Sequence, residues 1–177
     1  MVLKIFLVIA ALIVAVLIFA ATRPNSFQVE RSITINASPE RIFSLVNDLR
    51  AWERWAPEDR KDPAMKTTFS DPASGTGASS DWDSTGRGGK GRMQIVESIS
   101  PSKVSVKVDF VRPFEAHNLN QLSLVPDGSQ TRVTWSINAS QLYAMKLMGI
   151  FMSMEGVFGT HIQSGLNNLK ALAEKQP

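Results

Sequence analysis

The feature that most constrains this chain is the apolar segment at its N-terminus. Every residue from Ile5 to Ala21 is apolar, and Lys4 is the only charge before Arg23. A helix needs about 20 such residues to cross a bilayer, whereas the apolar part of a signal peptide is usually shorter. We therefore predict a transmembrane anchor over 1–22, a linker over 23–26 and one domain over 27–177.

The rival interpretation of this segment is a cleaved signal peptide. The stretch from Ile18 to Thr22 contains small residues, but it has no clean small-x-small cleavage site before Arg23. The absence of such a site favours an uncleaved single-pass anchor. Lys4 and the α-amino group favour a cytoplasmic N-terminus with the domain on the extracytoplasmic side, while Arg23 and Arg31 favour the opposite orientation.

Composition excludes several classes of function. The chain has 177 residues, a net charge of +3 and no cysteine. A charge this small does not predict nucleic-acid binding, and a chain without cysteine has neither disulfides nor thiolate metal ligands. The two histidines, His117 and His161, lack the spacing of a known ligand pattern, so neither a metal nor a cofactor is expected. The sequence gives no signal for an oligomeric state.

The domain begins with a strand and two short helices. Apolar and polar residues alternate over 27–36, with Arg31 interrupting the apolar side, as in a half-buried strand. Ser38 and Pro39 then provide an N-cap and a first helical residue. A second short helix is expected through Leu49, Trp52 and Trp55. Strand patterns at period two follow between 66 and 137, separated by turn residues, which predicts an antiparallel meander.

The last segment, 141–174, repeats apolar residues at helical spacing and predicts a long closing helix. Its first half is apolar on all sides except for Lys146, and it contains several glycines, so we expect a bend or break before Glu155. Methionines cluster between Met145 and Met154. Such flexible side chains suit an adaptable binding surface, a helix buried in the core or a helix that rests on the bilayer. In the last case the half-helix could gate the cavity and accept a lipid from the membrane.

Several stretches together resemble the START-like superfamily, in its polyketide cyclase/dehydrase (SRPBCC) subgroup. They are Ser38-Pro39-Glu40-Arg41-Ile42-Phe43, Trp52-Glu53-Arg54-Trp55, Gly88-Gly89-Lys90-Gly91, Val96-Glu97-Ser98, the run from Pro126 to Trp135, and Gly165-Leu166-Asn167-Asn168-Leu169-Lys170. The resemblance implies an α+β helix-grip fold, in which a curved antiparallel sheet wraps a long C-terminal helix around a hydrophobic cavity. It implies no particular reaction, because fold is a poor guide to chemistry.

Large apolar side chains are the candidates for lining such a cavity, although core packing is the commoner role for each one singly. The candidate ligand-binding residues are Trp52, Trp55, Trp82, Phe110, Trp135, Phe151, Met154, Phe158 and His161. We expect a membrane-anchored binder or carrier of a lipid-like or aromatic molecule, without catalytic residues. Two alternatives stay open. One is a cyclase or aromatase that uses His161 with Asp109 or Glu97, and the other is an interaction or stress-response module with a vestigial cavity.

Overall fold

The computed structural model describes residues 2–56, 62–86, 88–113, 115–141, 143–151 and 153–175. Within these ranges, seven antiparallel strands form one sheet in the order β1-β7-β6-β5-β4-β3-β2. The strands are β1 (Ser26–Ile35), β2 (Met65–Phe69), β3 (Ser79–Ser84), β4 (Lys90–Ile99), β5 (Lys103–Arg112), β6 (Ala116–Asp127) and β7 (Gln130–Ser140). The expected first strand and the antiparallel meander later in the chain are confirmed.

The first strand closes the sheet by pairing with the last one. β1 runs alongside β7 from the pair Ser26 and Ser140 to the pair Ile35 and Thr131. The hairpin between β6 and β7 turns at Gly128, whose φ of 63° is left-handed and therefore suits glycine. Alternation of side chains along each strand then gives the sheet one apolar inner face and one charged outer face.

Two short helices follow β1 as expected, and the first is capped by Ser38 as the sequence predicts. In α2 (Pro39–Val46), the Ser38 hydroxyl accepts a hydrogen bond from the Arg41 N–H, and Pro39 occupies the first turn. In α3 (Leu49–Trp55), the Asp48 carboxylate accepts from the Arg50 N–H at 2.8 Å. Both helices turn apolar side chains inward, which places two tryptophans of α3 in the core.

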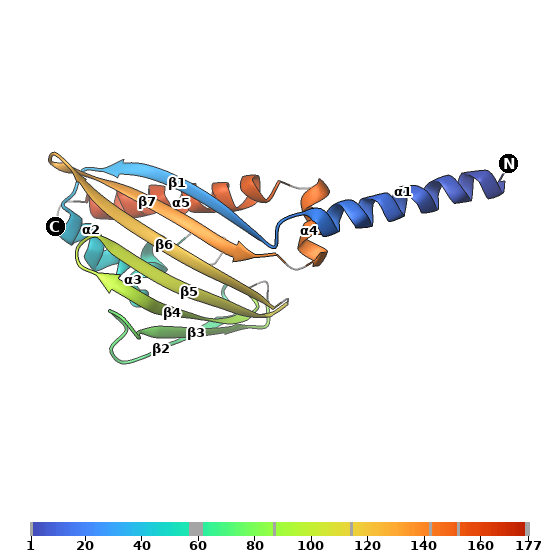
Figure 1. Cartoon of the computed structure of the whole chain (residues 1–177). Coiled ribbons are helices and arrows are strands. Elements are labelled where there is room, and N and C mark those ends of the chain that lie inside the picture. The colour runs from blue at the N-terminus through green and yellow to red at the C-terminus, as the bar shows by residue number, and fades with distance from the viewer. Residues whose placement is uncertain are drawn as a thin grey trace.

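The C-terminal apolar segment is broken into two helices, as expected. α4 covers Tyr143–Phe151, and α5 covers Met154–Ala173 with Ser153 as its N-cap. The Ser153 hydroxyl accepts from the Gly156 N–H at 3.1 Å, so a new helix starts rather than the old one continuing. Figure 1 shows α5, α2 and α3 on the same face of the sheet, which is the arrangement of a helix-grip fold.

The hydrophobic core lies between the inner face of the sheet and these three helices. Its fully buried members come from every layer and include Ile35, Ile42, Val46, Leu49, Trp55, Ile95, Val104, Val106, Leu122, Val133, Ile162, Leu166 and Leu169. At the free edge of β1, α5 supplies polar partners: Lys170 donates to the Thr34 carbonyl oxygen and Glu174 accepts from the Asn36 N–H. These bonds cover part of an edge that would otherwise be open to another strand.

The N-terminal helix α1 (Val2–Thr22) projects away from the domain, whose other helices and strands lie beyond its C-terminal end (Figure 1). Its side chains are largely exposed. Among the described residues of α1, Ala20 is the one that is buried. It is long and apolar enough to cross a membrane, and by the same test it also resembles a signal sequence. A helix of 21 residues measures about 30 Å, close to the hydrocarbon thickness of a bilayer.

Candidate hydrophobic ligand site

Three of the candidate tryptophans form a closed cluster under α5. Trp52 and Trp55 of α3 lie 4.7 Å apart between ring centroids, and Trp135 of β7 lies 6.1 and 5.5 Å from them. Each is at most 4% exposed. Their indole N–H groups donate to Val46 O, Leu45 O and Asn120 Oδ1 at 2.9–3.1 Å. Their donors are thus already engaged, and the cluster offers a ligand only the aromatic surface of its rings.

A second aromatic group lies on the inner face of the sheet, across β3, β4 and β5. Trp82 packs edge-to-face on Phe110 with ring centroids 5.4 Å apart. Gly91 pairs with both residues in the ladder and leaves room for the indole ring, because a Cβ there would overlap Trp82. The indole N–H donates to the Gly88 carbonyl oxygen at 3.1 Å. Trp82 is 8% exposed and Phe110 is half-buried, so this group can present apolar surface to the interior.

The remaining candidates belong to α5 and the segment before it. Phe158 packs on Phe27 of β1 with a centroid distance of 5.0 Å, and the His161 ring lies 6.1 Å from Trp135. Both side chains are half-buried. The side chains of Phe151 and Met154 lie outside the described part of the structure. The structure thus places the four tryptophans and Phe110 in two aromatic groups, with Phe158 and His161 on α5, which packs on β1 and β7.

The carboxylates considered for acid–base chemistry lie on the other face of the sheet. Asp109 is bonded to Lys107 at 2.9 Å and to His117 Nδ1 at 2.6 Å, and Glu97 is bonded to Lys103 at 2.7 Å. On β5, Val108 and Phe110 point inward, so Asp109 between them points outward by alternation. Glu97 pairs with Ser105, which lies between the inward-pointing Val104 and Val106, so Glu97 points outward as well. His161 approaches the inner face. The combination of His161 with Asp109 or Glu97 is therefore not formed.

The electrostatics of these carboxylates agree with structural ion pairs. Burial alone would raise the pKa of Asp109, but hydrogen bonds from Lys107 and His117 hold that pKa below its ordinary value. A hydrogen bond from Lys103, assisted by Ser105, lowers the pKa of Glu97 in the same way. Both groups are ionised at neutral pH, which is unsuited to an acid that must deliver a proton. Among the described residues, no cluster of three His, Asp or Glu side chains is placed to hold a metal ion.

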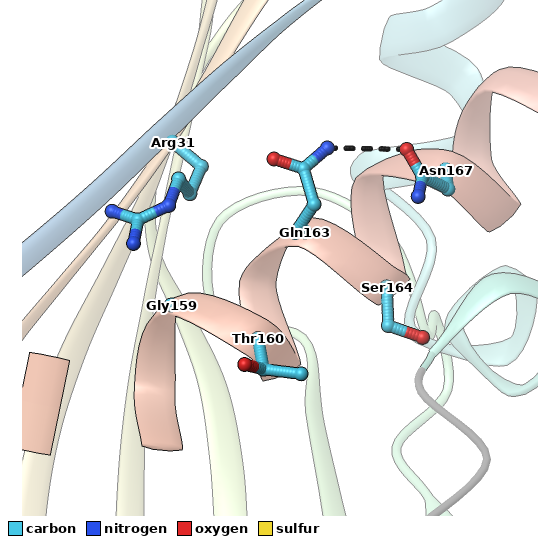
Figure 2. Close-up of a pocket in the computed structure, with 6 residues that line it drawn as sticks. All are labelled: Arg31, Gly159, Thr160, Gln163, Ser164 and Asn167. Atoms are coloured by element: carbon cyan, nitrogen blue, oxygen red, sulfur yellow. Dashed lines mark hydrogen bonds between the residues drawn. The ribbon is translucent and has the colours of Figure 1, made fainter. Parts of the chain in front are cut away.

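An open groove of about 450 Å³ runs along the seam between β1 and α5. Figure 2 shows Arg31 reaching from β1 toward α5, where Gln163 donates to Asn167 at 3.1 Å. The Arg31 guanidinium also bonds to Glu155 and to the Glu30 carbonyl oxygen. The lining residues are Arg31, Gly159, Thr160, Gln163, Ser164 and Asn167.

This groove is separate from the apolar candidates. Most of its lining residues carry amide, hydroxyl or guanidinium groups, but more of the lining surface is apolar than polar. Arg31 was visible in the sequence as an interruption of an apolar strand face, and the structure explains it by the ion pair with Glu155 at the edge of the sheet. None of the nine candidate residues is among those that line the groove.

The sheet, the covering helix and the apolar inner face define a helix-grip protein of the START-like type. Residues 26–174 match the family described as polyketide cyclase / dehydrase and lipid transport. The match spans most of the chain, so the protein belongs to this family, and the family suggests hydrophobic ligand binding. No curated protein matches the chain in sequence.

Solved structures share the fold at low sequence identity. A truncated norcoclaurine synthase from Thalictrum flavum aligns with a TM-score of 0.64 at 10% identity, over 86% of this chain and 96% of its own. A structural-genomics protein from Mesorhizobium loti gives 0.63 at 13% identity, over 85% and 99%. A hypothetical protein from Helicobacter pylori gives 0.60 at 9% identity, over 84% and 88%. At these identities the similarity shows the fold alone.

Proposed function

We propose that the protein binds or carries a hydrophobic small molecule, lipid-like or aromatic, between α5 and the inner face of the sheet, while α1 tethers it to a membrane. The single observation that carries this proposal is membership of the family over 26–174, in a chain whose N-terminal helix can span a bilayer. In this proposal, 1–22 is the anchor, 23–26 the linker and 27–177 the binding domain.

The aromatic group on β3–β5 is the proposed contact surface for the ligand. Trp82 and Phe110 face the interior, and Gly91 leaves the ring of Trp82 free to lie flat along the sheet. Phe158 and His161 lie on α5, next to Phe27 of β1 and Trp135 of β7. The side chains of Phe151 and Met154 lie outside the described part of the structure, and both residues stay candidates from the sequence. The cluster of Trp52, Trp55 and Trp135 would form an aromatic wall, because its polar atoms are engaged. Apolar walls with few polar groups are typical of sites for hydrophobic ligands.

The contacts between α1 and the domain support a retained anchor. The Tyr143 hydroxyl donates to the Leu17 carbonyl oxygen at 2.8 Å, and Lys146 donates to the Arg23 carbonyl oxygen at 2.9 Å. A cleaved signal peptide would take Leu17 with it and leave Tyr143 without this acceptor. Lys4 and the α-amino group favour a domain on the extracytoplasmic side, against the opposing charges of Arg23 and Arg31.

Catalysis receives no support from the same geometry. A cyclase or aromatase that pairs His161 with a strand carboxylate would need both groups on one face, whereas Asp109 and Glu97 lie on the outer face among their lysine partners. The non-enzymatic binder is therefore the function that the arrangement supports best. A domain with a vestigial cavity is the alternative that the binding experiment excludes or establishes.

The test is uptake of a hydrophobic probe by the delipidated domain from Arg23 onward. A fluorescent fatty-acid analogue should bind, and Phe110→Ala should weaken binding roughly tenfold, since loss of part of a phenyl contact costs about 1–2 kcal/mol. The matched control is Val111→Ala, because Val111 is the next residue on β5 and is 58% exposed. This control should bind like the wild type. A folded domain that takes up no probe would contradict the proposal.

A further inference from the structure

Helix α4 is fastened to the C-terminal end of α1 by side-chain bonds. The Tyr143 hydroxyl donates to the Leu17 carbonyl oxygen at 2.8 Å. The Lys146 ammonium donates to the Arg23 carbonyl oxygen at 2.9 Å and to Asn25 Oδ1 at 2.5 Å. The two helices are also in direct contact along this junction. Side-chain bonds thus hold the C-terminal end of α1 against α4, so α1 is not joined to the domain by a free linker alone.

Lys146 is the charged side chain that is buried at this junction. It is 8% exposed, although a lysine is rarely buried without partners. Its ammonium lies just beyond Thr22, the last residue of α1, where helix carbonyl groups give a partial negative charge that favours a cation. The apolar stem of the side chain can pack between the helices while the charged end reaches these carbonyls.

The rest of α4 carries no charge and is partly open to solvent. Tyr143 is 45% exposed and Met148 is 51% exposed, while Leu147 and Ile150 are half-buried. Continuous exposed apolar surface is uncommon on soluble domains and marks an interaction surface. Here the exposed side chains belong to a helix that contacts α1, whose own apolar side chains are exposed, and this neighbour favours a bilayer as the partner.

The direction of α4 fits a helix that lies in the membrane surface. Figure 1 shows α4 running across the C-terminal end of α1, between that helix and the sheet. An α1 that spans the bilayer along its normal would place α4 along the membrane plane. Tyr143 reaches the carbonyl of Leu17, five residues before Thr22, which is about 7.5 Å into α1 at 1.5 Å per residue. Interfacial helices bury their apolar face to about this depth.

We infer that α4 is an interfacial membrane helix whose lock to α1, through Tyr143 and Lys146, fixes the orientation of the domain on the bilayer. This inference rests on the proposed function, because it takes α1 as the anchor. Since α5 follows α4 directly and covers the inner face of the sheet, the lock turns the α4 end of the interior toward the lipid. A hydrophobic ligand then has a short path between bilayer and protein.

Depth-dependent fluorescence quenching tests the position of α4. The chain has no cysteine, so a single introduced cysteine in the full chain takes one NBD label. Three variants are compared in phosphatidylcholine vesicles whose lipids carry a nitroxide at a shallow or a deep position: Met148→Cys in α4, Leu12→Cys in α1, and Val125→Cys. Val125 is 56% exposed near the β6–β7 hairpin, at the end of the sheet away from α1 (Figure 1).

The inference predicts a distinct profile for each label. The label at 148 should be quenched several-fold more by shallow than by deep nitroxides, the label at 12 more by deep ones, and the label at 125 by neither. Quenching at 12 without quenching at 148 would overturn the inference and leave the anchor intact. Absence of quenching at 12 would instead overturn the anchor itself, and with it the membrane part of the proposed function.

Two further variants, each made in the Met148→Cys chain, test the lock. Lys146→Met removes the ammonium while keeping an apolar stem, and Tyr143→Phe removes only the hydroxyl. Lys66→Met is the control, since Lys66 is an exposed lysine of β2 away from the junction. Loss of the preference for shallow nitroxides in the first two variants, with the control unchanged, supports the lock. An unchanged preference in both Lys146→Met and Tyr143→Phe would overturn it.

Discussion

Replacing Gly91 by alanine should destabilise the domain by forcing Trp82 away from the sheet. A Cβ at this position would overlap the indole ring and would lie 2.5 Å from both Trp82 Cη2 and the Asp109 backbone oxygen. The backbone oxygen belongs to the neighbouring strand and cannot move freely. The ring is fixed as well, by its bond to Gly88 and by its contact with Phe110.

The size of the destabilisation follows from the atoms that must move to make room for the new Cβ. Overpacking a well-filled core costs about 1–3 kcal/mol, and the upper half of that range applies when both backbone and a fixed ring obstruct the new atom. For a domain of this size the melting temperature should fall by roughly 4–10 °C. Thermal unfolding of the full chain in detergent, followed by tryptophan fluorescence and circular dichroism, measures this shift.

A matched glycine provides the control for this experiment. Gly156 lies in α5, and an added Cβ would meet its nearest neighbour, Ser153, at 3.6 Å, an ordinary contact. Gly156→Ala should therefore leave the melting temperature unchanged or raise it slightly, because alanine favours a helix by about 1 kcal/mol over glycine. A Gly91→Ala protein that melts within a degree of the wild type would refute the packing argument, and with it the assigned position of Trp82.

Three smaller predictions test the core, a helix cap and an ion pair. Trp55→Ala should cost about 3–5 kcal/mol because the side chain is fully buried, and a loss below about 1 kcal/mol in denaturant unfolding would contradict that burial. Ser38→Ala should cost about 0.5–1 kcal/mol, at the low end for an N-cap because the bond is 3.4 Å long; unfolding of the alanine variant checks this. Asp109 has a lowered pKa in the folded state, so its stabilising effect is present above its ordinary pKa of 3.8 and is lost as the pH falls through the folded value. Wild type should thus lose more stability than Asp109→Asn between about pH 5 and pH 3, and parallel losses would show that the pair with Lys107 and His117 contributes nothing.

Much of the fold could be predicted because each element follows from a local pattern. Alternation of apolar residues in β1 and β7 fixes which face is inward, and Ser38 with Pro39 marks the start of α2. The break in the C-terminal apolar segment was also predictable, since glycines weaken a helix. In the structure, Ser153 caps the helix that starts after the break.

The site was less predictable because it depends on which residues meet across the sheet. Sequence alone grouped four tryptophans, whereas the structure divides them into a closed cluster and a separate Trp82 on β3. The sequence also left open a pair of His161 with Asp109, which the structure places on different faces of the sheet. Strand alternation already predicts that Asp109 and its neighbour Phe110 point to opposite faces.

At the junction between α1 and α4, the sequence contains a signal of a contact but does not identify the partner. Lys146 was the single charge in an otherwise apolar half-helix, and an isolated charge of that kind implies a polar partner. That partner is the C-terminal end of α1, over 120 residues earlier in the sequence. A contact at such separation leaves no trace in periodicity or composition, which is why only the folded structure supplies it.

The most direct test of the account is native mass spectrometry of the full chain, purified in mild detergent from membranes of its own host. The account predicts a reproducible mass above that of the denatured chain, from one hydrophobic molecule that is enriched over its proportion in the bulk lipid extract. It also predicts that Phe110→Ala loses this mass and Val111→Ala keeps it. A folded chain that carries only detergent, or membrane lipids in their bulk proportions, would contradict the claim that the interior holds a specific hydrophobic ligand.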